Sequence, residues 1–499
     1  MHAKLRRQLL GAAPREMTAR WLSALLVACA LAPTARAQRP TPCELVQQPV
    51  TRLTVDSLPG QGQVVFVGGA VLLKCPARGI TLKGDSAERF ADHDQMIGHA
   101  VYDEPRFHVT ANFLNYFPTD ERVVAVGDVH ARLANGSTLE GPQAEYRRAV
   151  PRVRPKAQMN AIGRPTINIL EKDSTGKTLP PTVVVANTVF VDGDSASLIY
   201  GGGQVTITRP DMSASGDSAM IDEDKEFMHL MRGPKLTGKK DRPFTLTGDL
   251  IDLFSKNRKL QRVIARAHAT AVSDSMTLRS DTIDLRVKNE LLDHAYAWGA
   301  TSRARVVSPS QNMIADSLDV SMPGQRVQLV RALNKAFAEG KPDTNRFIVD
   351  KPDTTNWLAG DTIVAHFDTI AAPKDTSRNP RIKQLVASGN ASSLYHMAPN
   401  DSTERRAAMN YVTARIITID FDSNTVATVT TVDSVTGVFI EPRADSIPRR
   451  ANAAPPAASG ARTTPPKTPP QKSPATPKPG TPPPAAPAST KRPPRDHSD

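Results

Sequence analysis

The stretch Leu246–Leu253 reads LTGDLIDL, and the same eight-residue pattern occurs ten times along the chain. Each copy has an apolar residue, a small residue two positions later, usually Asp or Asn next, and apolar residues at the sixth and eighth positions. The copies begin at Leu82, Val109, Leu139, Val184, Ala214, Leu246, Leu278, Met313, Leu358 and Val412. Because a unit of this size cannot bury its apolar side chains alone, the series predicts an array in which neighbouring repeats stack on one another.

The spacing inside the repeat predicts a bend. Its apolar positions fall at offsets of 0, 2, 5 and 7 residues. Alternate residues share one face of a regular strand, so the step of three would turn the second pair outward. An extra residue at a β-bulge or corner would return all four to one side. The small residue allows tight packing or unusual dihedral angles, and the Asp or Asn can hydrogen-bond nearby backbone groups. We therefore expect bends in register that fold the stacked strands into a trough with an apolar lining.

The remainder of each repeat is typical of a second strand. After Leu246–Leu253 comes a polar turn at 255–259, and then a segment in which small or apolar residues at 263, 265, 267 and 269 alternate with Arg262, Arg266 and His268. Alternation with period two, bounded by Asn- and Lys-rich turns, indicates a strand. Helical periodicity is absent over any comparable length. The sequence therefore predicts an all-β chain built from repeated strand pairs.

The net charge of +13 is concentrated at the two ends of the chain. Residues 1–37 contribute +5 and residues 449–499 contribute +7, which leaves +1 for the residues between them. A nucleic-acid-binding body would need a basic stripe to neutralise phosphates, and the repeats lack one. We expect no nucleic-acid partner.

Residues 1–37 have the features of an export signal. Basic residues precede the apolar run Trp21–Leu31, and the small-residue site Ala35-Arg36-Ala37 follows it. The run is about half as long as a membrane-spanning helix requires. We expect cleavage after Ala37. The alternative is a lipoprotein-type site at Leu26–Cys29, in which Cys29 would be the lipidated residue.

Composition divides the mature chain into three parts. Residues 38–62 read as a polar lead-in, 63–441 hold the repeats, and 442–499 form a Pro-rich tail with 15 prolines in its last 51 residues. The tail has too few apolar residues to offset the entropy of ordering, so we expect it to be disordered. Cys43 and Cys75 remain after cleavage at Ala37. In an oxidising compartment they could form one disulfide, and the alternative is two unpaired thiols.

Motifs for catalysis or metal binding are missing. The chain has no Gly-x-Ser-x-Gly elbow, no His-Glu-x-x-His helix and no phosphate-binding Gly-rich loop. Calcium needs several oxygens around one ion, whereas the repeats supply about one Asp each, so we interpret these residues as stabilising turns. They are Asp85, Asp217, Asp249, Asp281, Asp316 and Asp361. We expect no enzymatic activity, no cofactor and no metal.

The repeated small-residue–Asp pattern, together with Gly-rich segments that we interpret as strand starts, resembles the OstA-like family of LptA-type lipopolysaccharide-transport proteins of the periplasm. The Gly-rich segments are Val67–Leu73, Val126–Ala131, Gly202–Val205 and Ala387–Ala391. The resemblance covers residues 63–441. It implies an elongated open β-jellyroll, folded like a taco shell, that carries the acyl chains of lipopolysaccharide or another acylated glycolipid in its interior.

The resemblance also implies a location and partners. Domains of this family join end to end by pairing exposed edge strands, and they form a bridge across the periplasm toward an outer-membrane assembly protein. The chain is more than twice as long as a simple member of the family, so its body could contain two fused domains, about 63–240 and 241–441. We expect a periplasmic lipid carrier or bridge.

The residues expected to line the trough are the apolar residues of the repeats. They are Leu82, Val109, Leu114, Leu139, Val184, Val189, Leu246, Ile251, Leu253, Leu278, Ile283, Leu285, Leu318, Val320, Leu358, Ile363, Ile417 and Ile419. Small residues that we also place inward would leave room for an aliphatic ligand or would let the walls approach closely. These are Ala87, Ala111, Ala144, Ala186, Ala219, Ala265 and Ala267. The alternative to a lipid-filled trough is a structural β-solenoid with a closed core that binds protein partners, and a polysaccharide-acting enzyme on a solenoid platform comes third.

Overall fold

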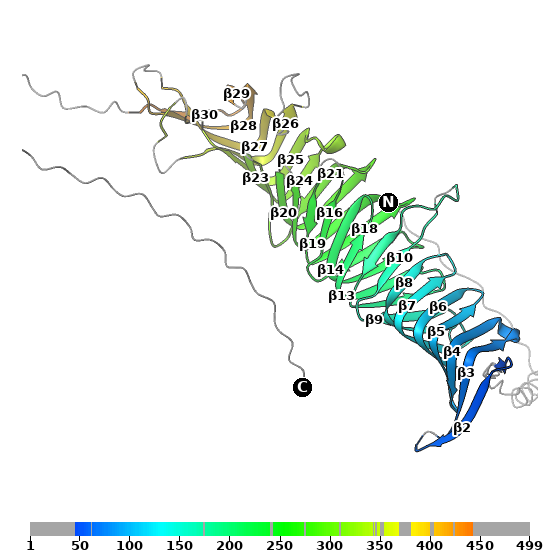
Figure 1. Ribbon diagram of the computed structural model, residues 1–499. Helices are drawn as coiled ribbons and strands as arrows, with labels where there is room; N and C mark the ends of the chain where they lie inside the picture. The colour runs from blue at the N-terminus through cyan, green and yellow to red at the C-terminus, as the bar shows by residue number, and fades with distance from the viewer. Residues whose placement is uncertain are drawn as a thin grey trace, which may run out of the picture. The chain divides into compact units, whose positions relative to one another are not determined.

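The computed structural model describes residues 45–60, 62–172, 175–239, 243–273, 276–308, 311–342, 344, 347–349, 354–368, 381–399, 404–422 and 425–442 (Figure 1). The predicted export signal with Cys29, the residue Cys43, and the tail from residue 443 onward lie outside these residues. The described part is all-β. Its only helical segments are two short 3-10 turns, η1 at Pro76–Arg78 and η2 at Pro323–Gln325.

Thirty strands make up this part of the chain. The first ten are β1 (Val46–Gln47), β2 (Arg52–Leu58), β3 (Gly62–Cys75), β4 (Ile80–Arg89), β5 (Asp94–Glu104), β6 (Phe107–Phe117), β7 (Arg122–Leu133), β8 (Thr138–Arg147), β9 (Gln158–Ile162) and β10 (Thr166–Ile169). The next ten are β11 (Thr182–Val185), β12 (Thr188–Asp192), β13 (Leu198–Thr208), β14 (Met212–Asp222), β15 (Phe227–Met231), β16 (Lys235–Gly238), β17 (Thr245–Thr247), β18 (Leu250–Lys256), β19 (Lys259–Ser273) and β20 (Met276–Lys288). The last ten are β21 (Leu291–Trp298), β22 (Ala304–Val307), β23 (Gln311–Ala315), β24 (Ser317–Ser321), β25 (Leu329–Gly340), β26 (Asn356–Asp368), β27 (Arg381–Met397), β28 (Ala408–Asp422), β29 (Thr425–Val432) and β30 (Thr436–Ile440).

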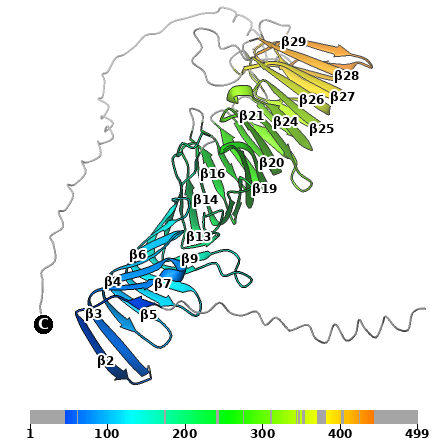
Figure 2. The same ribbon diagram turned by 90° about the vertical axis from the view of Figure 1, so that its right-hand side faces the viewer.

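The strands form one antiparallel ladder that follows the order of the chain, from β2 and β3 at one end to β28, β29 and β30 at the other (Figures 1 and 2). Each repeat crosses a bend near its middle. The ladder before the bend forms one wall, as in the pairing of Leu82 with Tyr102, and the ladder after it forms a second wall, as in the pairing of Ala87 with Met96. We call the line of bends the corner. The opposite line, where the strands of both walls end in turns, is the mouth.

At the corner, every second bent strand carries a β-bulge built from two consecutive residues with positive φ. In β7, Gly127 has φ 77° and Asp128 has φ 48°, and the register with β6 shifts between Val126 and Val129. Equivalent pairs lie in β3, β5, β13, β19, β25 and β27. They are Gly69–Ala70, Gly98–His99, Gly203–Gln204, Ala267–His268, Asn334–Lys335 and Gly389–Asn390. The predicted bends are therefore present, but the extra residue of each bulge lies in the strand beside the eight-residue pattern. In the pairing of β6 with β7, for example, the step from Thr110 to Phe113 lies opposite the longer step from Val126 to His130.

Two details of the predicted bend are corrected. The segments interpreted as strand starts are not starts, because they lie in the middle of β3, β7, β13 and β27, where they form the bulges. The small residue of the repeat provides close packing rather than an unusual dihedral angle. A Cβ on Gly84 would lie 3.1 Å from the carbonyl oxygen of Ser86, and one on Gly248 would lie 3.1 Å from that of Arg266.

The lead-in is joined to the body by strand pairing. Within residues 38–62, β1 and β2 pair with opposite halves of β3. The sheet continues across residue 240 through the pairings of β15 with β18 and of β16 with β17. Residues up to Arg443 group into one unit by their contacts. The division into domains at about residue 240 stays a prediction.

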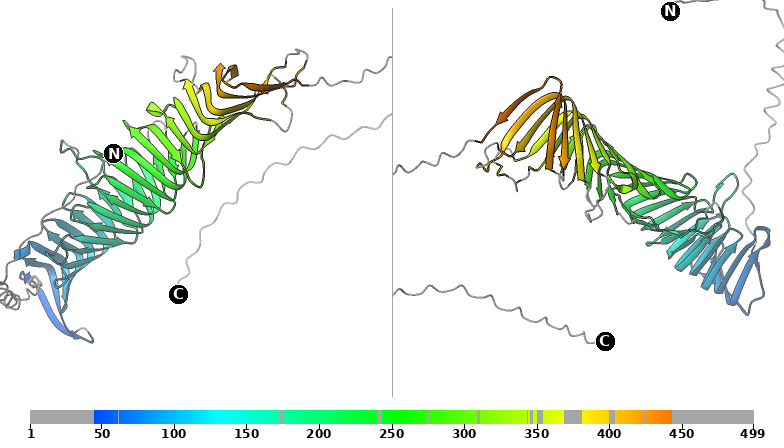
Figure 3. Two further views of the ribbon diagram at one scale, coloured as in Figure 1. Left: turned by 180° about the vertical axis from the view of Figure 1, so that it is seen from behind. Right: turned by 90° about the horizontal axis from the view of Figure 1, so that it is seen from above.

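The core is the space between the two walls. Buried apolar side chains form one cluster that extends from Val67 in β3 to Ile419 in β28. Inward and outward side chains alternate along each wall, as in β28, where Ile417 and Ile419 are fully buried. Figure 3 shows the stacked strands of the two walls from behind and from above. This continuous apolar interior is the first candidate for a functional site.

Candidate lipid-binding interior and its mouth

All of the residues predicted to line the trough face the interior, and each is 2% exposed or less. The first wall holds Leu82, Val109, Leu139, Val184, Leu246, Leu278 and Leu358. The second wall holds Leu114, Val189, Ile251, Leu253, Ile283, Leu285, Leu318, Val320, Ile363, Ile417 and Ile419. These side chains all belong to one buried apolar cluster that follows the stack of strands.

These side chains are beyond the reach of water, so the walls lie against each other and the interior is a dry core. Six of the seven alanines expected inward are also buried, and they let the walls approach closely. Ala267 is the exception. It lies exposed at the corner with φ 57°, because it is one of the two bulge residues of β19. Any ligand of the interior would have to separate the walls.

The mouth is bridged by buried polar groups that the sequence did not single out. Glu104, at the end of β5 in the first wall, is 8% exposed. Its carboxylate accepts hydrogen bonds from Nε of Arg148 at 2.8 Å and from the hydroxyl of Tyr146 at 2.5 Å, both on the second-wall side. The hydroxyl of Tyr102 donates to the same carboxylate at 3.2 Å. One carboxylate thus ties the two walls together.

Further pairs across the mouth flank Glu104. Arg78, in the turn η1 of the first wall, pairs with Glu121 in the turn between β6 and β7 of the second. Arg106 pairs with Asp194 at 2.9 Å. Arg78 and Glu121 are both largely buried, so loss of either one would leave the other charge buried without its partner. The mouth is therefore held closed over the N-terminal half of the stack.

A second bridge lies farther along the mouth at Arg258, in the turn between β18 and β19. Its guanidinium pairs with Glu171 from the first wall and with Glu223 from the second. Burial raises the pKa of Glu171 to about 8, and the neighbouring carboxylate of Glu223 adds to this effect, while Arg258 opposes it. Two carboxylates that share one guanidinium in a poorly hydrated site favour retention of a proton.

The tyrosines at the mouth are kept neutral. Burial, with a contribution from the charge of Glu104, raises the pKa of Tyr102 and of Tyr146 far above the usual value. Burial also raises the pKa of Tyr116 to about 12. Phe107 stacks on Tyr146 with ring centroids 3.8 Å apart. These rings close the mouth above the aliphatic interior, and the hydroxyl groups of Tyr102 and Tyr146 donate hydrogen bonds to Glu104.

The repeated Asp residues lie at the corner and contact the bulges, in line with their interpretation as stabilisers of turns. Oδ2 of Asp85 lies 2.8 Å from Nδ1 of His99, and Asp361 accepts a hydrogen bond from Asn390 at 3.1 Å. Asp281 accepts from the backbone nitrogens of Thr301 and Ser302, and these bonds lower its pKa. Asp217 and Asp316 pair with Arg232 and Arg303, and Asp249 pairs with His268. Within the described ranges no group of three or more His, Cys, Asp or Glu residues is arranged to hold a metal ion.

Cys75 at the end of β3 is disulfide-bonded. Its predicted partner, Cys43, lies outside the described residues, so the pairing stays a prediction. In the part of the chain that the structure covers, no helix is long and apolar enough to cross a membrane.

The fold and the site define a two-walled all-β jellyroll with one continuous apolar interior. No protein-family model matches the chain, and no curated protein matches it. Among solved structures it is similar to LptH from Pseudomonas aeruginosa, the LptA-homologous periplasmic component of a lipopolysaccharide transport device. The identity is 18%, the match covers 26% of this chain and 94% of LptH, and the TM-score is 0.22. An identity and a TM-score this low support no conclusion about fold or function, so the fold assignment rests on the strands and their pairing.

Proposed function

We propose that the protein is a periplasmic carrier or bridge for an acylated glycolipid such as lipopolysaccharide, with no enzymatic activity. The observation that supports this most is the apolar interior, which runs without a break from β3 to β28. The core of a compact domain is closed on all sides. An apolar core that extends along a stack of strands provides a path along which an acyl chain can move. The resemblance of the repeats to the OstA-like family points in the same direction.

Entry of lipid requires the walls to separate. The free energy gained by burying acyl chains can offset the free energy lost with the contacts at the mouth. An acyl chain of about twelve carbons gains about 10 kcal/mol when it leaves water for an apolar interior. The opposing cost is the loss of the mouth contacts at Glu104, at Arg258 and in the pairs Arg78–Glu121 and Arg106–Asp194, where each charge-assisted hydrogen bond contributes about 1.5–3 kcal/mol. Contacts between the walls are replaced by contacts with the chain. Several acyl chains on one lipid therefore outweigh the mouth contacts.

The two ends of the stack suit a bridge. In the described part of the chain, β2 pairs only with β3, while β29 and β30 pair only with β28. Apolar side chains are exposed at both ends, namely Leu53, Val55, Val438, Phe439 and Ile440. An unpaired edge with exposed apolar residues is a surface for strand addition. We propose that similar jellyroll domains, and finally an outer-membrane assembly protein, pair with these edges.

Photocrosslinking in living cells tests the proposal. A photoreactive amino acid at Ile251 or Ile283, both fully buried between the walls, should crosslink to glycolipid. The same group at Arg286, which is exposed on the outer face of β20, is the matched control and should not. Crosslinks from Ile251 and Ile283 to protein only would contradict the proposal.

A closed-core scaffold for protein partners is the second candidate. It is favoured by the burial of the inward side chains and by the bridged mouth. In that case crosslinking from the interior would give only bonds within the chain, and bonds to other proteins would come from outer positions such as Arg286. The same experiment therefore separates the two candidates.

A further inference from the structure

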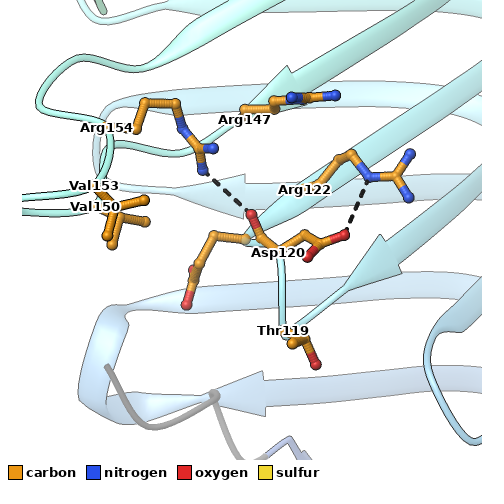
Figure 4. Close-up of a pocket in the computed structure, with 8 residues that line it drawn as sticks. Thr119, Asp120, Arg122, Arg147, Val150, Val153 and Arg154 are labelled. Carbon is orange, nitrogen blue, oxygen red and sulfur yellow. Dashed lines mark hydrogen bonds and ion pairs between the residues drawn. The ribbon is translucent and has the colours of Figure 1, made fainter. Parts of the chain in front are cut away.

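A cavity of about 480 Å³ lies at the mouth, between the turn that joins β6 to β7 and the loop that follows β8 (Figure 4). Three guanidinium groups line it, those of Arg122, Arg147 and Arg154. The loop is held by two backbone hydrogen bonds between Val150 and Arg154, of 2.7 and 2.8 Å. The cavity therefore has a fixed wall and a concentration of positive charge.

Arg154 is the least neutralised of the three. Its Nε donates to the carbonyl oxygen of Arg148 at 2.7 Å, and its Nη2 donates to that of Asp120 at 3.2 Å. Among the ion pairs of the described residues, none joins Arg154 to a carboxylate. Burial lowers the pKa of Arg154, and the positive charge of Arg147 lowers it further. A guanidinium held in place by carbonyl groups, next to another cation, is prepared to bind an anion.

The other two arginines are only partly neutralised. Arg122 lies over the ring of Phe117 at 3.9 Å, which fixes its plane. It faces Asp120 at 4.0 Å and Glu145 at 3.6 Å, both beyond hydrogen-bond distance. Arg147 donates to Glu145 at 2.6 Å. The carboxylate of Glu121, also at the cavity, is engaged by Arg78 and Arg148. Of the three guanidinium groups, only that of Arg147 therefore has a carboxylate of the described residues within hydrogen-bond distance.

We propose that this cavity binds a phosphate group, with Arg154 and Arg122 as its main ligands and the exposed carboxylate of Asp120 displaced on binding. A phosphate offers several acceptor oxygens and up to two charges, and a guanidinium recognises it through paired hydrogen bonds. On the basis of the proposed function, the phosphate belongs to the headgroup of the acylated glycolipid. The site would hold that headgroup at the mouth, beside the line along which the acyl chains enter.

Calorimetry on the full exported chain, first with inorganic phosphate, tests the site itself. Arg154→Gln should weaken phosphate binding about tenfold, because one charge-assisted hydrogen-bonding partner is lost. Arg232→Gln makes the same charge change at the corner, away from the cavity, and should leave the affinity unchanged. Asp120→Asn removes the competing carboxylate and should tighten binding, a result that misfolding cannot produce. Equal affinities for the wild type and all three variants, or no binding at all, would overturn the proposal.

The second arm of the experiment identifies the source of the phosphate. Micelles of an acylated glycolipid are compared with the same glycolipid after removal of its phosphates. Tighter binding of the phosphorylated form, lost in Arg154→Gln, supports the headgroup assignment. Equal binding of both forms overturns that assignment and leaves lipid carriage standing. Binding of inorganic phosphate without binding of either glycolipid supports a site for free phosphate and contradicts lipid carriage.

Discussion

Glu104 in the first wall accepts a hydrogen bond of 2.8 Å from Nε of Arg148 in the second, although 44 residues separate them in the chain. The tie crosses the mouth and not the corner, so it does not help to form the bend. It holds together two strand ends that could otherwise move apart. The walls are joined covalently at every bend, whereas at the mouth they are held only by non-covalent contacts, so the mouth is where the structure can open.

Removal of the negative charge of Glu104 should loosen the mouth. Glu104→Gln keeps the shape of the side chain but leaves the half-buried Arg148 without its full partner. We expect the free energy of unfolding in urea to fall by about 2 kcal/mol. Glu140→Gln, whose side chain is 53% exposed, is the control and should change it little. Equal effects of the two substitutions would show that Glu104 does not hold the walls together.

The bridge at Arg258 should make stability depend on pH. The pKa of Glu171 is raised from 4.5 to about 8 in the folded protein, so the folded state retains a proton that the unfolded state releases. The contribution of this proton is complete below pH 4.5 and is lost as the pH rises toward 8. Stability measured by urea unfolding should therefore decline over this window. Glu171→Gln should flatten the decline, and an unchanged slope in that variant would exclude Glu171 as its source.

The corner should tolerate a side chain only where there is room. Gly389 has φ 74°, and a Cβ there would lie 2.3 Å from Oδ2 of Asp361. Gly176 is the matched control, because it has φ 85° and a Cβ there would have no atom within 4 Å. Alanine at either site costs about 1–2 kcal/mol because of the left-handed conformation. Gly389→Ala should cost more than Gly176→Ala in thermal unfolding, because Asp361 must also move. Equal losses would mean that the contact with the corner Asp does not matter.

The ends of the stack should mediate self-association. Val55 in β2 is 53% exposed and Val438 in β30 is 54% exposed. A lysine at either position should reduce head-to-tail pairing and lower the average mass measured by analytical ultracentrifugation, because charge on an edge strand opposes strand addition. Val126→Lys, on the outer face in the middle of the stack, should have no such effect. If all three variants keep the mass of the wild type, the edges do not pair.

The fold could be predicted from the sequence because the spacing of the repeats and the step of three inside each repeat are both visible among residues that are close in the chain. Apolar residues such as Leu246 and Ile251 could be placed on one face once a bulge was assumed, and both are fully buried. The error at Ala267 arose because simple alternation was carried through the bulge. The Gly-rich segments were read as strand starts because glycine is frequent at turns, although in this fold glycine provides the left-handed residues in the middle of a strand.

The mouth could not be predicted, because it is formed by residues distant in sequence. Glu104, Arg148 and Arg258 look like ordinary charged residues next to turns. Their burial depends on which strand ends face each other across the two walls, and this follows from the register of the whole ladder. The one available signal was the position of these charges at strand ends that otherwise alternate regularly.

The distance between the walls during lipid binding tests the central claim most directly. Spin labels at Val272, near the end of β19 in the first wall, and at Lys288, at the end of β20 in the second, lie on opposite sides of the mouth and away from its ion pairs. Labels at Lys256 and Lys288, both in the second wall, are the control. We expect electron paramagnetic resonance to show a longer distance between Val272 and Lys288 after addition of acylated glycolipid, with no change in the control pair. Binding of glycolipid with an unchanged distance between the walls would contradict the account.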